Sequence, residues 1–144
     1  MNPPLKTLFD ISVLVDALTN AEHPAPESSA ALTLAATGHI TGYVCAATIE
    51  SLHDLLARTH GYPGASAKLS ALRAMLEIAP VDAEVIDSAM GLGWRYFDDA
   101  LIHECARVNG LDRVISLNAP DFDAATLPVL APGELLRQVQ AAAA

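Results

Sequence analysis

The segment Leu5–Leu18, with the sequence LKTLFDISVLVDAL, decides the fold of this chain, because its hydrophobic pattern changes period within a few residues. The run from Leu5 to Phe9 is typical of a short buried strand, and Asp10 follows it directly. Ser12 is a favourable N-cap for a helix, and apolar residues then recur at helical spacing. The segment therefore predicts a strand, an aspartate at its carboxyl end, and a helix.

The rest of the chain repeats this alternation. Further strands are predicted at 40–45, 78–81, 113–116 and 128–130. Helices are predicted to begin near Pro26, at the N-caps Thr48, Asp82 and Asp98, after a turn at 61–64, and at Pro132. Apolar strands separated by helices predict an α/β fold with a central parallel sheet of about four to five strands and helices on both faces.

The length of 144 residues suits one domain, which we expect to span residues 1–140. The last four alanines, 141–144, are interpreted as a frayed helix end or a cloning remnant. Eight Lys and Arg residues stand against seventeen Asp and Glu residues, which gives a formal net charge of −9. These totals lack the basic excess typical of nucleic-acid-binding proteins, so binding of an anion needs a local device such as a metal ion.

Other features of the sequence exclude further classes of protein. No apolar run reaches the roughly 20 residues that a membrane-spanning helix needs. The N-terminus lacks the basic-then-apolar layout of a signal peptide. Cys45 and Cys105 have no metal-binding or redox spacing, so we expect two buried, reduced thiols. Together these features predict a cytoplasmic protein with no membrane association.

Side chains with oxygen ligands follow several of the predicted strands. They are Asp10, Glu50, Asp99, Asn118 and Asp121. The carboxyl ends of parallel strands form the edge at which α/β sheets bind ligands, so we expect these side chains to converge there. Converging carboxylates raise each other's pKa, and a hard cation such as Mg²⁺, or Mn²⁺, is the usual compensation.

Each of these acids also has a purely structural interpretation. Acids in the first turn of a helix stabilise it by about 0.3–1 kcal/mol, and Asp and Asn are common caps and turn formers. Taken singly, each residue is better explained as such a device. Their joint placement at one sheet edge is what favours a metal site.

The local sequences resemble those of PIN-domain ribonucleases, especially the VapC-like toxins of type II toxin–antitoxin modules. Five segments carry the resemblance, in order along nearly the whole chain. They are Leu8–Asp16 (LFDISVLVD), Ala47–Leu52 (ATIESL), Phe97–Leu101 (FDDAL), Ile115–Phe122 (ISLNAPDF) and Val129–Leu136 (VLAPGELL). Each segment alone is weakly specific, and the five together in this order are much more so.

The resemblance implies a PIN-like three-layer fold and a Mg²⁺-dependent endoribonuclease that hydrolyses phosphodiester bonds. It assigns Asp10, Glu50 and Asp99 as the catalytic, metal-binding acids. Asn118 stands where many members have a fourth acid, and Asp121 lies nearby in the sequence. Asp10 and Asp99 are expected closest to the ion, with Glu50 binding it directly or orienting a water molecule.

Three residues depart from the family pattern. Ser12 replaces a common Asn and changes a polar partner of the site, and Leu117 replaces a frequent basic residue. Asn118 instead of Asp would hold a second metal ion more weakly. We therefore expect one well-formed metal site, with any second ion depending on bound RNA phosphate.

Several other polar residues are weaker candidates for the site. Asp98 is interpreted mainly as the N-cap of its helix, with a secondary metal role, and Asp16 as a solvated acid. His103 shares a helix face with Asp99 and is interpreted as an ordinary surface or half-buried histidine. His53 and His60, near Arg58, could contact RNA, but a solvated helix face is the favoured interpretation.

Two functions from different classes remain open. The first is the ribonuclease toxin, with an RNA substrate, an inhibitory antitoxin that presents a basic segment, and a homodimeric state. The second is a catalytically weak PIN-like module that acts through protein partners, for which Ser12, Leu117 and Asn118 leave room. A dehalogenase-type phosphatase is excluded, because that class needs a second aspartate where Ser12 stands.

Overall fold

The computed structural model describes residues 3–19 and 26–143; the predicted interruption at Pro24 and the final Ala144 lie outside these ranges. Its centre is a five-stranded sheet with the order β3-β2-β1-β4-β5, in which every pair of neighbours is parallel. The strands are β1 (Lys6–Phe9), β2 (Thr41–Cys45), β3 (Leu76–Ala79), β4 (Arg113–Ile115) and β5 (Val129–Leu130). This confirms the predicted parallel sheet of four to five strands.

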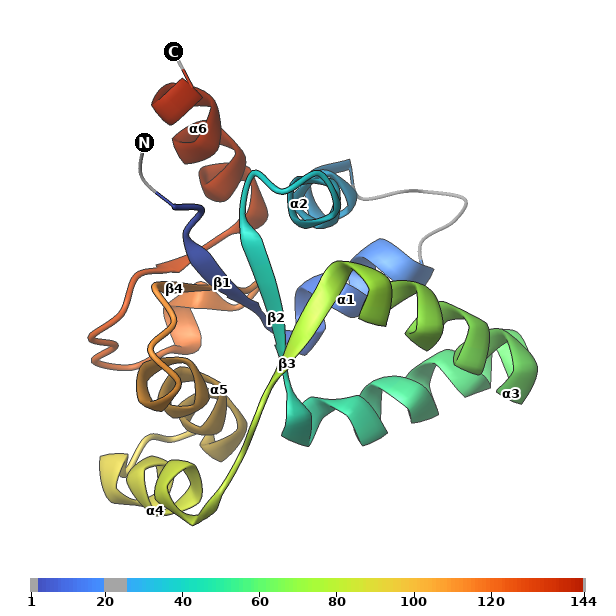
Figure 1. Ribbon diagram of the computed structural model, residues 1–144. Coiled ribbons are helices and arrows are strands. Elements are labelled where there is room, and N and C mark those ends of the chain that lie inside the picture. Colours follow the sequence, from blue (N-terminus) through green and yellow to red (C-terminus); the bar gives the residue numbers. More distant parts are fainter. Residues whose placement is uncertain (1–2, 20–25, 144) are drawn as a thin grey trace.

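Helices cover both faces of the sheet, as Figure 1 shows. They are α1 (Ile11–Thr19), α2 (Pro26–Ala36), α3 (Ile49–Met75), α4 (Ala83–Leu92), α5 (Phe97–Val108) and α6 (Pro132–Ala143), with short 3₁₀ turns at η1 (Ala46–Thr48) and η2 (Ala119–Asp121). Helices α1, α2, α3 and α6 supply one hydrophobic core, and α4 and α5 supply the other. The fold is therefore the expected three-layer α/β arrangement. Ala141–Ala143 continue α6 and are exposed.

The strands alternate their side chains between these two cores. In β1, Leu8 packs with the α4–α5 core and Phe9 packs with the α1–α2–α3 core, and both are fully buried. In β4, Val114 likewise packs with the α4–α5 core and Ile115 packs with the α1–α2–α3 core. Because both faces of the sheet are covered, apolar residues occupy successive positions, which explains why the strands appear in the sequence as unbroken apolar runs.

Two predicted helix starts are wrong by one or two residues, and a third predicted N-cap has the right position but makes no capping hydrogen bond. Helix α1 begins at Ile11, so Ser12 lies in its first turn and is not the N-cap. Helix α5 begins at Phe97 with Tyr96 at the N-cap position, which places Asp98 in the first turn. Thr48 is at the N-cap position of α3, as predicted, but its hydroxyl donates to the carbonyl of Cys45, 2.8 Å away, and accepts no hydrogen bond from the helix. A residue caps a helix only if its backbone dihedral angles are non-helical, and the residue type alone does not determine those angles.

Other boundaries are closer to the prediction. Asp82 caps α4 as expected, with its carboxylate accepting a hydrogen bond from the Val85 amide. The predicted turn at 61–64 is a kink inside α3, where Gly61 has φ 72° and ψ 170°. The strand predicted at 78–81 is β3 and lies two residues earlier. No helix among the described residues combines the length and apolar composition needed to cross a membrane.

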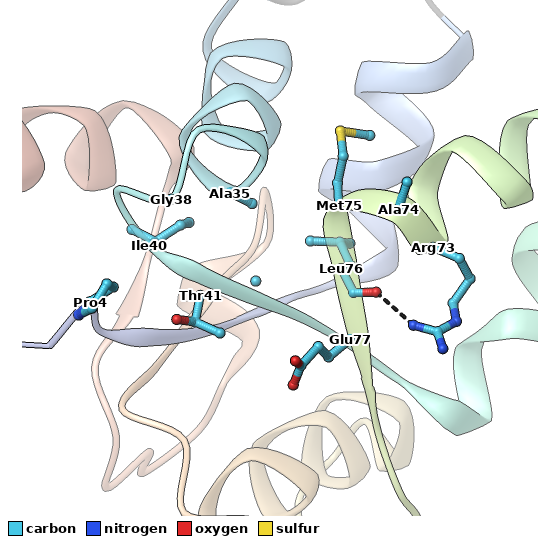
Figure 2. A pocket seen from close by; sticks show the side chains of 11 residues that line it. Pro4, Ala35, Gly38, Ile40, Thr41, Arg73, Ala74, Met75, Leu76 and Glu77 are labelled. Carbon is cyan, nitrogen blue, oxygen red and sulfur yellow. Dashed lines mark hydrogen bonds between the residues drawn. The ribbon is translucent and has the colours of Figure 1, made fainter.

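A hollow of about 520 Å³ lies where β2 and β3 begin, shown in Figure 2. Thr41 and Gly42 line it from β2, and Leu76 and Glu77 line it from β3. Arg73 donates to the Leu76 carbonyl at 3.0 Å, which closes the end of α3 against this strand. The hollow faces the amino ends of the strands, opposite to the edge at which α/β sheets bind ligands.

Gly42 provides a test of the packing between β2 and its neighbours. A Cβ atom at this position would collide with the Leu76 side chain and lie 2.9 Å from the Cβ of Ala35. We expect Gly42→Ala to lower the free energy of unfolding by about 1–3 kcal/mol, as overpacking does. Urea denaturation followed by circular dichroism would measure the change.

Gly91→Ala is the matched control for that substitution. A Cβ atom at Gly91 would meet nothing within 4 Å, and the residue lies in α4, where alanine is the better helix former. This control should be neutral or stabilise the protein by up to about 1 kcal/mol. Equal effects of the two substitutions would contradict the packing described for Gly42.

Candidate active site

Asp10 lies at the carboxyl end of β1, the middle strand of the sheet. Register pairs Phe9 with Val44 of β2 and with Ile115 of β4, so the next residue of each strand reaches the same edge. The Asp10 amide donates to the Ile115 carbonyl at 2.9 Å, and the Asp10 carbonyl accepts from the Val13 amide at 3.1 Å. The residue thus ends the strand and begins α1, and only 4% of its surface is exposed.

Two serine hydroxyls hold one oxygen of the Asp10 carboxylate. Ser12 Oγ donates to Oδ2 at 2.8 Å, and Ser116 Oγ donates to the same atom at 2.7 Å. Each serine oxygen in turn accepts from a backbone amide of the loop after β4. The Leu117 amide lies 3.0 Å from Ser12 Oγ, and the Asn118 amide lies 2.9 Å from Ser116 Oγ. Oδ1 receives no hydrogen bond from the described residues, so it is the oxygen left for another ligand.

Ser116 is a site residue that the sequence analysis did not single out. It is the first residue after β4 and is fully buried. Its position after a predicted strand could have indicated this role. In a parallel sheet, the residues that follow two paired strands lie side by side, as Asp10 and Ser116 do. The predicted polar role of Ser12 beside Asp10 agrees with its hydrogen bond, although its predicted capping role is wrong.

Asp99 brings a second carboxylate to this edge. It lies in the first turn of α5 and is partly buried. Burial, as the largest cause, and then the negative charges of Asp10, Asp121 and Asp98 together raise the pKa of Asp99 to about 6. The charges of three other predicted acids therefore act on Asp99, which is an arrangement that a bound cation relieves.

A small cavity of about 180 Å³ opens beside Asp10. Its lining includes Ile11 of α1, Thr48 of η1, Ser51 of α3, and Asp98 and Leu101 of α5. Glu50 is not in this lining and is exposed in the first turn of α3. The convergence of Glu50 with Asp10 and Asp99 thus stays a prediction.

The donor set suits a hard divalent cation in part. Within residues 3–19 and 26–143, no three His, Cys, Asp or Glu side chains form a group that could hold a metal ion. Mg²⁺, however, keeps several of its waters and is commonly held by one or two carboxylates together with substrate phosphates. Asp10 and Asp99 supply carboxylate oxygens of this kind at one sheet edge, so they fit such an ion.

The loop after β4 carries the remaining predicted residues. Asn118 is exposed at the N-cap position of η2, and its backbone carbonyl accepts from the Asp121 amide at 2.8 Å. The structure shows no hydrogen bond between the Asn118 side chain and a described residue. Asp121 acts on the site through its charge on Asp99. Asp16 is not merely solvated, because Ser28 of α2 donates to its carboxylate at 2.8 Å.

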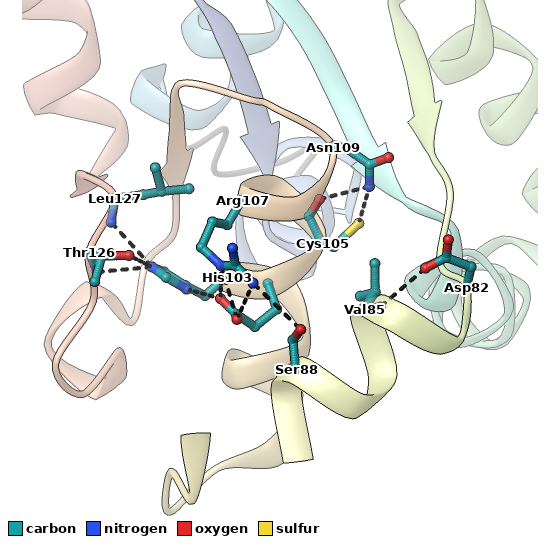
Figure 3. A network of polar contacts seen from close by, with 10 residues as sticks. Asp82, Val85, Ser88, His103, Cys105, Arg107, Asn109, Thr126 and Leu127 are labelled. Carbon is teal, nitrogen blue, oxygen red and sulfur yellow. Dashed lines mark hydrogen bonds and ion pairs between the residues drawn. The ribbon is translucent and has the colours of Figure 1, made fainter. Parts of the chain in front are cut away.

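His103 is buried, so its interpretation as a surface or half-buried residue is wrong. Nε2 accepts from the amides of Thr126 and Leu127 at 3.1 and 3.2 Å, which leaves the proton on Nδ1 to donate to Glu104 at 2.8 Å. Figure 3 shows this network, which continues through Arg107 towards Ser88 of α4. The network joins α5 to the chain before β5 and to α4.

Glu104 is the charged centre of that network. Burial alone would raise the pKa of its carboxyl group, but hydrogen bonds from Arg107 and His103 outweigh burial and lower the pKa. The carboxylate is 4% exposed and lies 3.0 Å from the Arg107 guanidinium. It therefore contributes stability at neutral pH that is lost as the pH falls through its lowered pKa.

A parallel three-layer sheet with acids gathered at its carboxyl edge defines the chain as an α/β protein with a candidate cation-binding site. The family model of the PIN domain matches residues 6–119, which cover most of this sequence and include every strand except β5. The chain belongs to the PIN domain family. No curated protein sequence matches the chain.

Solved structures with the same fold come from bacterial toxin–antitoxin systems. VapBC2 of Rickettsia felis, bound to a promoter DNA fragment, has a TM-score of 0.68 at 17% identity, covering 88% of this chain and 97% of that one. A toxin–antitoxin complex from Klebsiella pneumoniae has a TM-score of 0.68 at 19% identity, with the same coverage. VapC20 of Mycobacterium tuberculosis, a toxin that cleaves the sarcin–ricin loop, has a TM-score of 0.65 at 17% identity, covering 84% and 95%. The chain thus shares the fold of VapC toxins, as the sequence resemblance predicted.

The charge of Asp10 should be visible in the titration of Asp99. We expect Asp10→Asn to lower the pKa of Asp99 from about 6 towards its ordinary value of 3.8, because one of the repelling charges is removed. Burial remains, so the pKa should stay above the ordinary value. Carboxyl ¹³C NMR titration of the metal-free protein measures this pKa directly.

The control is Asp112→Asn, which changes an acid at the amino end of the sheet, where Asp112 accepts from the Lys6 amide. It should leave the pKa of Asp99 unchanged. An unchanged titration of Asp99 in Asp10→Asn would refute the coupling.

The raised pKa of Asp99 also affects stability. The free energy of unfolding should fall as the pH rises from about 4 to about 6, since the folded state then holds a proton that the unfolded state has released.

His103→Ala tests the buried network. The substitution leaves the amides of Thr126 and Leu127 without their acceptor and opens a cavity beside Trp94, whose ring centroid is 5.1 Å from that of His103. We expect a loss of about 2–4 kcal/mol in the free energy of unfolding. His39→Ala removes an exposed histidine and should cost less than about 0.5 kcal/mol. A loss below about 1 kcal/mol for His103→Ala would show that the network adds little stability.

Proposed function

We propose that this protein is a metal-dependent endoribonuclease that hydrolyses RNA phosphodiester bonds with Mg²⁺, or Mn²⁺, and serves as the toxin of a toxin–antitoxin pair. The observation that carries the proposal is the Asp10 carboxylate, which is fixed through Oδ2 beside the like-charged Asp99. Membership of the PIN domain family and a fold shared with VapC toxins support it.

The three predicted acids would have different roles in the site. Asp10 and Asp99 would hold the ion, with Oδ1 of Asp10 presented because both serine hydroxyls occupy Oδ2. When bound, such an ion neutralises phosphate charge and makes a nearby water a better nucleophile. Glu50, exposed at the start of α3, would orient that water or complete the ligand set as substrate arrives.

Asp121, Asp98 and Asn118 would surround this centre as secondary residues. The charges of Asp121 and Asp98 already act on Asp99, so they add to the local attraction for a cation. Asn118 is held to the site through its backbone, since its amide donates to Ser116. Its neutral side chain supports one well-formed ion site, with any second ion dependent on RNA phosphate.

The proposed partners follow from charge and exposed apolar surface. The antitoxin of such a pair would present a basic segment to the acidic edge, and the net charge of −9 favours that association. Met90 is 62% exposed and Phe97 is 45% exposed, which leaves apolar surface for a homodimer contact. A toxin of this kind would act in the cytoplasm, where its RNA substrate is found.

Cleavage of RNA tests the proposed activity directly. We expect wild-type protein to cleave single-stranded RNA only with Mg²⁺ or Mn²⁺ present, and Asp10→Asn or Asp99→Asn to lower the rate by about 100-fold or more. Denaturing gels of a labelled RNA give the rates. Calorimetric titration with Mn²⁺ should show weaker binding by both variants than by wild type.

Asp112→Asn is again the control, because it alters an acid at the other end of the sheet. It should cleave RNA and bind Mn²⁺ as the wild type does. Equal cleavage by wild type and Asp10→Asn would exclude chemistry at Asp10. No cleavage by any of these proteins would favour the alternative, a catalytically weak module that acts through protein partners.

A further inference from the structure

The middle of α3 presents an exposed aromatic and basic cluster that the candidate active site does not use. We call it the kink surface and define it by His53, Asp54, Arg58 and Tyr62. Gly61, with φ 72° and ψ 170°, interrupts the helix just before Tyr62, whose side chain is 75% exposed. The rings of Tyr62 and His53 are stacked, with centroids 6.3 Å apart and planes 17° apart. A tyrosine this exposed contributes little to the core, so its ring is free to bind a ligand.

A hollow of about 450 Å³ lies against this aromatic pair. Asp54, Ala57, Arg58, Gly61 and Tyr62 line it. None of these residues has an aliphatic side chain larger than that of alanine, so the hollow does not suit the apolar face of a partner helix. A planar ring with an adjacent guanidinium group is instead the combination that binds a nucleotide, by stacking on its base and pairing with its phosphate.

The charge of α3 differs from that of the rest of the chain. Three of the eight basic residues, Arg58, Lys68 and Arg73, lie in α3, whereas only two of the seventeen acids, Glu50 and Asp54, do. The remaining sequence therefore holds five basic residues and fifteen acids. A polyanion that approaches this protein is repelled least along α3.

The kink surface also lies in line with the candidate active site. Glu50, Asp54 and Arg58 are spaced four residues apart, so they occupy one face of the helix, and all three are exposed. Eight residues of helix span about 12 Å, and roughly three to four stacked nucleotides cover that distance at about 3.4 Å each. Ser51, which lines the cavity beside Asp10, lies seven residues before Arg58, about 10 Å along the helix, so a single strand bound at this cavity can reach Arg58.

We propose that the kink surface binds a nucleotide of single-stranded RNA, a few nucleotides away from the bond that is cleaved. Tyr62, supported by His53, stacks on the base, and Arg58 contacts a phosphate. This inference rests on the proposed ribonuclease function, and it adds a second RNA contact that gives affinity for strands longer than the few nucleotides at the metal site.

Binding of an uncut RNA separates this inference from the chemistry. The probe is a fluorescein-labelled single-stranded 12-mer RNA, and the protein carries Asp10→Asn so that the RNA stays intact. Against this background, Tyr62→Ala should weaken binding about tenfold, since loss of one stacked base has an effect of that order. Tyr62→Phe keeps the ring and should bind within about twofold of the background protein. Fluorescence anisotropy gives the dissociation constants.

Arg58→Gln tests the phosphate contact independently. It should reduce the slope of log affinity against log salt concentration by about 0.7, as loss of one phosphate contact to a single strand does. Arg95→Gln is the control, because Arg95 is an exposed arginine outside α3 whose guanidinium lies over Tyr96. It should leave the slope unchanged. Circular dichroism melts of all variants verify that the fold is retained.

The outcomes distinguish this proposal from the proposed function. If Tyr62→Ala binds the 12-mer as tightly as Tyr62→Phe, or if the background protein binds no RNA, the kink surface is not an RNA site. If Tyr62→Ala changes only the sedimentation coefficient, the surface is a contact with a second copy and the proposal is likewise overturned. Failure of wild-type protein to cleave RNA, with the Tyr62 difference in affinity present, would refute the hydrolysis and leave the binding site established.

Discussion

The structure depends on the way one buried carboxylate is accommodated at the end of its central strand. Removing an ionised carboxylate from water costs several kcal/mol unless hydrogen bonds replace the lost hydration. For Asp10 that replacement comes from Ser12 and Ser116, whose hydroxyls donate to one oxygen at 2.8 and 2.7 Å. Because Ser12 lies in the first turn of α1 and Ser116 directly follows β4, the same two bonds tie the first strand, its helix and the loop after β4 into one unit.

That unit determines the electrostatics of the sheet edge. The parallel register brings the residues after β1 and β4 side by side, and α5 adds Asp99 close enough for its pKa to be raised to about 6. The site is therefore built with a repulsion that a cation relieves. The net charge of −9 at first argues against nucleic acid, but acids gathered at one edge are the means by which a bound cation can attract phosphate.

Much of the fold could be predicted from apolar periodicity, because strands buried on both faces appear in the sequence as short continuous apolar runs. The strands predicted at 5–9, 40–45 and 113–116 differ from β1, β2 and β4 by one residue at one end. β3 was placed two residues late, because α3 leads into it with no turn residue between Met75 and Leu76. The helix caps were missed because several neighbouring polar residues can cap, and packing selects among them.

The site was predictable to the extent that strand ends are. The place of Asp10 at the end of β1 follows from strand topology, whereas the side on which Glu50 lies depends on the rotation of α3. Leu52 and Leu56 are fully buried, and Glu50 lies two residues before Leu52, roughly 200° around the helix from it. The packing that fixes α3 on the sheet therefore turns Glu50 and Arg58 outward together. The same rotation leaves Glu50 out of the lining of the cavity beside Asp10. It also exposes a polar face of α3 that extends from Glu50 to Arg58.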